Sequence, residues 1–117
     1  MNDLTMTSKV TPQLVSVKFV GRMDAEGVRQ ITEAFEKVTS NPAPVLVDLS
    51  EVSFLESLGV AILVRLAKRL RDEKRGVAVI PGAGPVARIL GVARLDKVLN
   101  VVFTHDVALE VLGVSST

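Results

Sequence analysis

The sequence contains no cysteine, no tryptophan and no tyrosine, and His105 is its single histidine. The lack of cysteine excludes a disulfide framework and thiolate metal sites, and one histidine is too few for an ordinary zinc site. The lack of tryptophan and tyrosine argues against a site that stacks on bases or sugars. We therefore expect no metal and no cofactor.

A strong charge imbalance and long apolar runs are also missing. The formal net charge is +1 over 117 residues, which gives no electrostatic footprint for nucleic acid or an anionic membrane. No apolar run reaches transmembrane length, and the first ten residues lack the apolar core of a signal peptide. We expect a cytoplasmic protein that binds no nucleic acid and does not insert directly into a membrane.

Apolar residues, in contrast, are plentiful, at 48% of the chain. That is enough for a sizeable hydrophobic core, and 117 residues is close to the commonest size of a single domain. We expect one domain over residues 1–117, with frayed ends at 1–3 and 113–117.

The apolar residues are densest between Val45 and Leu70. Residues 45–49 form a nearly continuous apolar run, which is typical of a strand buried on both faces. From Leu58 onward the apolar residues recur with helical spacing, which predicts a long buried helix that begins at Ser57 after a short crossover. A basic cluster late in this helix is typical of a solvated helix face; it consists of Arg65, Lys68, Arg69 and Arg71.

The remaining chain is divided by proline and glycine turn signals. We expect strands at 4–10, 14–20, 77–80 and 98–103, and helices at 25–39, 86–93 and 106–112. The order is then β-β-α-β-α-β-α-β-α, an α/β fold with a mixed sheet of four to five strands and about four helices. Strand–helix–strand units of this length require parallel pairing with right-handed crossovers.

Two polar residues far apart in the sequence are predicted to meet in this fold. Asp24 follows the second strand and Ser57 follows the third, and loops that leave the carboxyl ends of parallel strands share one edge of the sheet. Ser57 has two interpretations. It is either an ordinary helix N-cap, or a hydroxyl placed where the positive end of a helix stabilises added negative charge.

Three motifs, in order, resemble the signature of STAS domains, specifically of the bacterial anti-sigma factor antagonists. A strand that ends in Asp48-Leu49 leads through residues 52–55 to Glu56-Ser57-Leu58-Gly59, which is similar to the family's Asp-Ser-Ser/Thr/Ala-Gly. Upstream, residues 21–24 match the family's Gly-Glu-Leu-Asp, and downstream residues 94–99 match Gly-Leu-Asp-Lys-Val/Leu-Phe. The resemblance covers nearly the whole chain and implies the STAS fold.

The resemblance also implies a phosphorylation-gated binding module with no catalytic residues of its own. In the family, an ATP-dependent serine kinase that is also the anti-sigma factor phosphorylates the antagonist. The unphosphorylated antagonist binds that kinase and releases the sigma factor, and a PP2C-type phosphatase restores the free serine. By position, Ser57 is the phosphoacceptor, and Asp24, Glu56, Leu58 and Gly59 lie at the partner-binding surface.

The chain departs from the family pattern at three positions. Glu56 replaces an aspartate, Leu58 replaces a small residue after the phosphoacceptor, and Arg94 stands where glycine is common. At Arg94, a left-handed backbone would be strained. Some STAS proteins are instead accessory subunits of transporters or lipid-export complexes and are not phosphorylated, which is the first alternative.

The second alternative is a small nucleotide-binding or hydrolytic α/β domain. Ser57, Asp24 and His105 form a conceivable hydrolase triad, although the sequence has no Gly-x-Ser-x-Gly elbow. The turn at residues 81–85 lies where phosphates often bind, but it matches neither a Walker loop nor GxGxxG. Ser53 is a second phosphoacceptor candidate, which we expect to be less accessible than Ser57.

Overall fold

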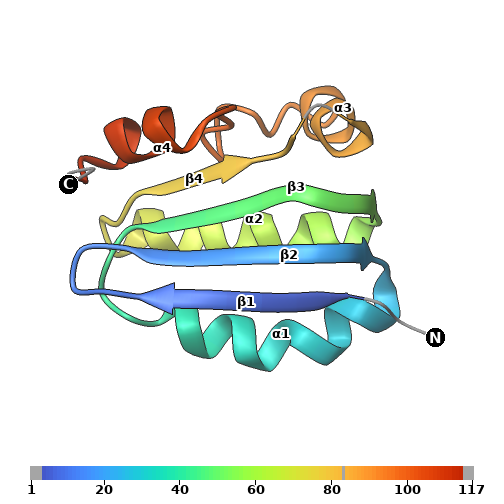
Figure 1. The fold of residues 1–117 in the computed structure, drawn as a ribbon, viewed down its shortest axis with the longest axis horizontal. Coiled ribbons are helices and arrows are strands. Elements are labelled where there is room, and N and C mark those ends of the chain that lie inside the picture. Colours follow the sequence, from blue (N-terminus) through green and yellow to red (C-terminus); the bar gives the residue numbers. More distant parts are fainter. Residues whose placement is uncertain (1–3, 83, 115–117) are drawn as a thin grey trace.

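The computed structural model describes residues 4–82 and 84–114, which form one mixed sheet of four strands in the order β1-β2-β3-β4 (Figure 1). β1 pairs antiparallel with β2, and β2, β3 and β4 are parallel. The strands are β1 (Thr5–Val10), β2 (Val15–Met23), β3 (Val45–Leu55) and β4 (Val77–Ile80). The helices are α1 (Ala25–Thr39), α2 (Ser57–Asp72), α3 (Pro85–Val92) and α4 (His105–Leu112).

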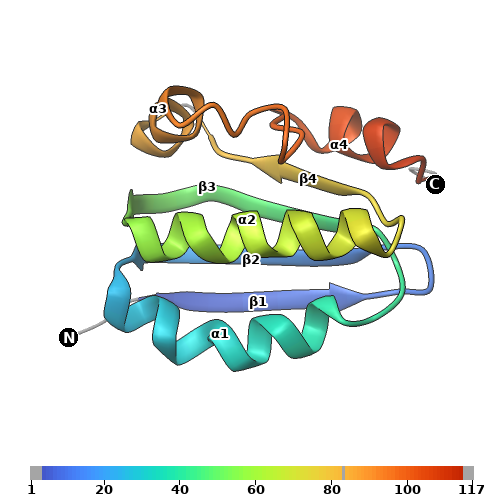
Figure 2. The ribbon, with the colours of Figure 1, turned by 180° about the vertical axis from the view of Figure 1, so that it is seen from behind.

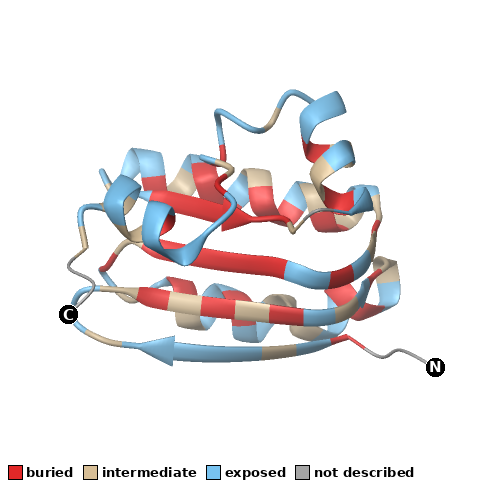
Figure 3. Ribbon diagram, turned by 45° about the horizontal axis from the view of Figure 1, so that its top comes forward, coloured by how far each residue is buried: buried red, intermediate tan, exposed pale blue. Residues whose placement is uncertain are grey.

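Two hydrophobic cores lie on opposite faces of the sheet, because successive side chains of a strand point to opposite faces. The larger core lies between the sheet and the two long helices, α1 and α2, which cover one face (Figure 2). The smaller core lies on the other face, where α4 covers β4 and part of β3. Figure 3 shows the buried residues concentrated in the middle of the sheet, with β1 exposed along its edge. The smaller core consists of Leu46, Ala78, Ile80, Val102 and Ala108.

The two middle strands run further than the sequence predicts. β2 continues through residues 21–23, where we expected a break, and β3 continues through residues 50–55, where we expected a crossover. The pairing carries irregularities on either side of Gly21, whose φ of 113° favours glycine. As a result, Met23 lies opposite Leu55, and the two strands end side by side.

The predicted fifth strand at 98–103 is wrong. Of these residues only Val101 takes part in strand pairing, as an isolated parallel bridge to Val79. Asn100 has a φ of 50°, and its side chain donates to a backbone carbonyl of β4 at 2.9 Å. The amide of Val101 donates back to Asp96 at 2.8 Å, so this segment turns on itself and cannot extend along β4. The element order is therefore β-β-α-β-α-β-α-α.

The last helix is held at both ends. The Thr104 hydroxyl accepts from the Val107 amide at 3.1 Å, which starts α4 at His105. At the other end Gly113 has a φ of 70°, and the Val114 amide donates to Leu109 at 2.9 Å. Gly113 and Val114 are thus hydrogen-bonded to the helix, whereas the predicted frayed residues 1–3 and 115–117 lie outside the described residues.

Asp48 links α4 to β3. Its side chain accepts from the amide of Ser50 at 2.9 Å and from the Ser50 hydroxyl at 2.6 Å, and it lies 3.4 Å from Nε2 of His105. Burial alone raises the pKa of the Asp48 carboxyl, but the bonds from Ser50 and the contact with His105 together outweigh burial. The pKa of Asp48 therefore lies below its ordinary value.

This lowered pKa predicts an acid-sensitive contribution to stability. A group whose folded-state pKa is depressed stabilises the fold above its unfolded pKa of about 4, and the stabilisation is lost as the pH falls through the folded value. We expect Asp48→Asn to lower the free energy of unfolding by about 1–2 kcal/mol at neutral pH. The difference between variant and parent should be smaller at about pH 3. Urea unfolding of both proteins at the two pH values measures this difference in unfolding free energy. A difference that is as large at pH 3 as at neutral pH would contradict the prediction.

Candidate functional site

The carboxyl ends of β2 and β3 and the first turns of α1 and α2 meet at one edge of the molecule (Figure 1). The Glu56 amide donates to the Met23 carbonyl at 3.1 Å. The carboxylate of Glu56 in turn accepts from the amide of Ala25 at 2.6 Å. These bonds join the two segments that carry Asp24 and Ser57. We call the five residues predicted for this surface the rim: Asp24, Glu56, Ser57, Leu58 and Gly59.

Asp24 caps α1, as the sequence predicts. One oxygen of its side chain accepts from the Gly27 amide at 2.8 Å, which satisfies one of the free amides of the first turn. The other oxygen lies 4.0 Å from Nε of Arg22. The Asp24 carboxylate is therefore held at the edge of the sheet, half-buried, next to the Glu56 segment.

Ser57 is the first residue of α2, which confirms the predicted start of the helix, but it is not the N-cap, so the first of its two interpretations is wrong. The N-cap is Glu56, whose side chain points to α1 instead of its own helix. Among the residues that the structure describes, no side chain caps α2. The first amides of a helix have no intrahelical partner and form its positive end. The exposed Ser57 hydroxyl therefore lies where a negative group would be stabilised.

The two apolar positions of the rim pack α2 onto the ends of the strands. Leu58 is half-buried and contacts the larger core. Gly59 is buried, and a Cβ atom there would lie 2.7 Å from Cδ1 of Leu55 and 3.4 Å from Cβ of Met23. Gly59 thus allows the close approach that brings the helix start against both strands.

Sequence reasoning missed two residues next to the rim. Arg22 on β2 pairs with Phe54 on β3, and the guanidinium carbon lies 4.3 Å above the centre of the aromatic ring. Arg22 is exposed, so it places a positive charge beside the acidic rim. A strand pattern that continues through residues 21–23 would have indicated these positions, but Gly21 interrupts the alternation of apolar and polar residues there.

The hydrolase triad is not assembled. His105 contacts Asp48 near the middle of β3, whereas Ser57 follows the end of that strand at Leu55. Seven residues of extended chain span roughly 23 Å. The structure therefore brings Asp24 near Ser57 but leaves His105, whose side chain is 62% exposed, elsewhere.

Ser53 and Gly82, which belongs to the predicted turn after β4, each lie against a neighbouring strand. Ser53 is exposed, as Ser57 is, and its hydroxyl donates to the Gly21 carbonyl at 3.4 Å. In the turn, Gly82 has a φ of 74°, and a Cβ there would lie 3.0 Å from Cα of Ser50, so this turn needs glycine to pass β3.

Within residues 4–82 and 84–114, no group of three or more histidine, aspartate or glutamate side chains is placed to hold a metal ion. The helices found in these ranges are too short or too polar to cross a membrane.

The bond from Ala25 to Glu56 predicts a measurable cost when the carboxylate is removed. We expect Glu56→Ala to lower the free energy of unfolding by about 1 kcal/mol, because the amide of Ala25 loses a charged acceptor at a half-buried position. Glu56→Gln keeps an acceptor oxygen and should lose about half as much. Urea unfolding followed by circular dichroism compares the three proteins. Equal losses in the two variants, or none in either, would argue against this bond.

Comparisons with known proteins agree with the fold and with the motifs. A solved anti-sigma factor antagonist from Mycobacterium paratuberculosis superposes with a TM-score of 0.83 at 27% identity, covering 95% of each chain. An anti-sigma factor antagonist (STAS) domain protein from Planctomyces limnophilus gives a TM-score of 0.76 at 28% identity, covering 96% of this chain and 98% of that one. A STAS-domain containing protein of Pseudomonas aeruginosa is 20% identical over 84% of this chain and 97% of its own length.

The family comparison covers most of the chain. Residues 6–102 match the family described as Mlab, STAS domain, and this range contains the rim and all four strands apart from the first residue of β1. The chain therefore belongs to the STAS domain family.

Proposed function

We propose that this protein is an anti-sigma factor antagonist whose rim binds an anti-sigma factor serine kinase while Ser57 is unphosphorylated. Binding occupies the kinase and releases its sigma factor. Family membership supports this proposal, as do two structural relatives above 25% identity that are described as anti-sigma factor antagonists. In this role the chain is a substrate and binding partner and has no catalytic residues of its own.

The observation that carries the proposal is the exposed Ser57 at the first position of an uncapped helix. A kinase needs an accessible hydroxyl, and Ser57 is exposed where α2 leaves the sheet. The kinase would transfer the terminal phosphoryl group of ATP to Oγ of Ser57, releasing ADP and a proton. A PP2C-type phosphatase would hydrolyse that ester to free serine and inorganic phosphate.

Phosphorylation at this position is expected to leave the domain folded. A phosphate adds about −1.5 to −2 charges at neutral pH. The free amides in the first turn of α2 favour this charge, because no described side chain already occupies them. The added charge acts on the surface and leaves the core unchanged.

The same charge is unfavourable at a docked interface. Glu56 and Asp24 are already acidic, and a partner packed on the rim would have to desolvate the phosphate beside them. A loss of about 3 kcal/mol in binding free energy corresponds to a change in affinity on the order of a hundredfold. Local charge at Ser57 is thus sufficient to control association without refolding.

Leu58 gives the rim an apolar component. Its side chain is half-buried against the larger core, so part of its surface remains available to a partner. A leucine after the phosphoacceptor, where the family has a small residue, would restrict which kinases fit. The competing proposal is an accessory STAS subunit of a transporter or lipid-export complex, in which Ser57 is never phosphorylated.

The first prediction from this proposal concerns the site of phosphorylation. Incubation with ATP and the anti-sigma factor serine kinases encoded in the same genome should add one phosphate to the chain, measured by intact mass. Ser57→Ala should abolish the addition. Ser53→Ala, which removes a second exposed hydroxyl close to the rim, should not change it. Phosphate uptake by none of these kinases would favour the accessory subunit, and turnover of ATP or an ester by the purified chain alone would favour an enzyme.

The second prediction concerns binding. Ser57→Asp should keep the unfolding free energy within about 0.5 kcal/mol of the parent protein and weaken kinase binding on the order of tenfold or more. Ser57→Asn has nearly the same size without the charge, so it should bind close to normally. Calorimetric titration of the kinase with each variant tests this. Full binding by Ser57→Asp, or equal loss in both variants, would contradict control by charge.

A further inference from the structure

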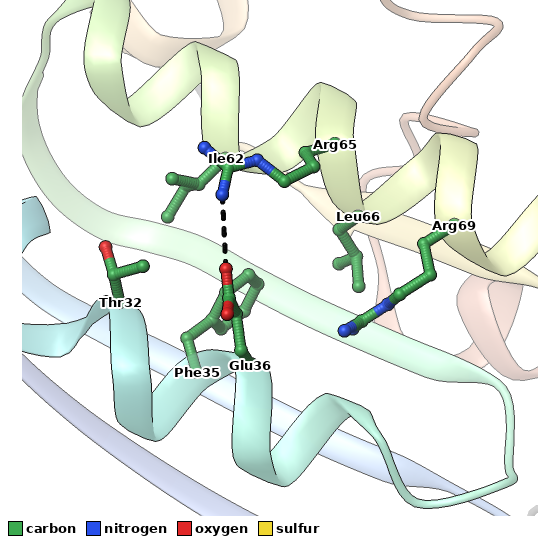
Figure 4. A pocket seen from close by; sticks show the side chains of 7 residues that line it. All are labelled: Thr32, Phe35, Glu36, Ile62, Arg65, Leu66 and Arg69. Carbon is green, nitrogen blue, oxygen red and sulfur yellow. Dashed lines mark hydrogen bonds and ion pairs between the residues drawn. The ribbon is translucent and has the colours of Figure 1, made fainter.

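The basic cluster of α2 divides between two sides of the helix. Arg65 pairs with Glu36 of α1 at 3.2 Å (Figure 4), and the Arg69 guanidinium donates to the hydroxyl of Thr39. These two arginines therefore hold the long helices together, on either side of a small cavity of about 30 Å³. Lys68 has no place in this contact.

Lys68 and Arg71 instead line a cleft between α2, the start of β4 and the turn after α3. The cleft has a volume of about 480 Å³, within the range of small-molecule sites. Lys97, in the turn after α3, also lines the cleft. The apolar part of the lining is made by Val64, Ala67, Val77 and Val98.

The charge in this cleft is of one sign. None of the described residues that line it is acidic. Lys68, Arg71 and Lys97 are exposed, and within residues 4–82 and 84–114 no ion pair is formed by any of them. The negative end of α2 accounts for Arg71 in its last turn, but not for Lys97, which comes from a different segment.

A fourth cation of the cleft has a structural role. The Arg75 side chain is only 9% exposed and pairs with Glu73 at 2.7 Å. Its guanidinium also donates to the carbonyls of Thr39 and Ala43 at 2.9 and 2.8 Å. Arg75 therefore fixes one wall of the cleft, while the three exposed cations remain available to a ligand.

We propose that this cleft binds an organic phosphate, a phosphomonoester that carries an apolar group. Lysine and arginine side chains from two segments, α2 and the turn after α3, match a phosphate, which accepts several charged hydrogen bonds. The apolar part of the lining, including Val98 at 52% exposure, matches the organic part. The concave shape favours a small molecule over an acidic protein surface. Eleven residues of helix, roughly 16 Å, separate Lys68 from Ser57, so this site is independent of the proposed function.

Phenyl phosphate and inorganic phosphate, which carry the same phosphate group, are the probes. Each is titrated into the ¹⁵N-labelled chain at constant ionic strength and followed by two-dimensional NMR. Phenyl phosphate should give saturable shifts confined to the amides around Lys68, Gly76 and Asn100. It should bind about tenfold more tightly than inorganic phosphate, because its phenyl ring would be buried against the apolar residues of the cleft.

Paired charge removals test the specificity of the cleft. The double variant Lys68→Gln/Lys97→Gln should weaken phenyl phosphate about tenfold, the expected effect of losing two exposed ion pairs. Lys9→Gln/Lys37→Gln makes the same change in net charge away from the cleft and should bind as the parent does. Equal weakening in both variants, equal affinity for the two probes, or no saturation would overturn the proposal. Tighter binding of polyglutamate than of phenyl phosphate would also overturn it, in favour of an acidic protein partner.

Discussion

The parallel pairing of β2 and β3 to their last residues is the constraint on which the rim depends. Met23 lies opposite Leu55, and one backbone bond, from Glu56 to Met23, closes the pair. Each strand is separated from its helix by a single residue, Asp24 in one case and Glu56 in the other. Neither connection has a loop that can adjust. The positions of the rim side chains are therefore fixed by the sheet, and a partner that binds there orders little additional chain.

Both acidic side chains of the rim accept hydrogen bonds from α1, and neither caps the first turn of α2. Asp24 caps its own helix, whereas Glu56 reaches across to the first amide of the other helix. Glutamate is one methylene longer than the aspartate that the family resemblance leads one to expect, which extends its reach toward α1. Because neither carboxylate occupies the first turn of α2, a phosphate on Ser57 would meet free amides there. The substitution at position 56 is thus compatible with the proposed switch.

Sequence patterns predicted most of the fold because the long elements have unambiguous periods. Residues 45–49 and the apolar stripe of α2 were buried as expected. The wrong strand at 98–103 arose from an apolar run whose residues serve two cores: Leu99 packs in the larger core and Val102 in the smaller. A turn at Asn100 makes that division possible, and nothing in hydropathy indicates it. The length of β3 was missed because the continuous buried run ends at Leu49. Three of the residues 50–55 are exposed, so this segment was interpreted as a short crossover.

The sequence predicted which segments meet at the candidate site more accurately than it predicted the individual contacts between them. The rule that sites collect at the carboxyl ends of parallel strands brought Asp24 and Ser57 together. Residue type alone cannot distinguish an N-cap from the first helical residue, so the N-cap interpretation of Ser57 was off by one position. The bond from Glu56 to α1 depends on the direction of a side chain, which sequence spacing does not determine. Arg94 shows the opposite case. Its φ of 59° is the left-handed backbone expected where the family often has glycine, and an arginine adopts it here.

The burial of α2 explains why the proposed switch can act through charge at the end of this helix. Its middle, from Ile62 to Leu70, packs against the sheet and holds the helix in place. A rigid helix keeps its dipole fixed, positive at Ser57 and negative at the cluster that includes Lys68 and Arg71. The first end favours added negative charge, and the second already carries cations. A charged group at either end would change what the surface attracts without any change in the core, so the proposed regulation of association requires no change in stability.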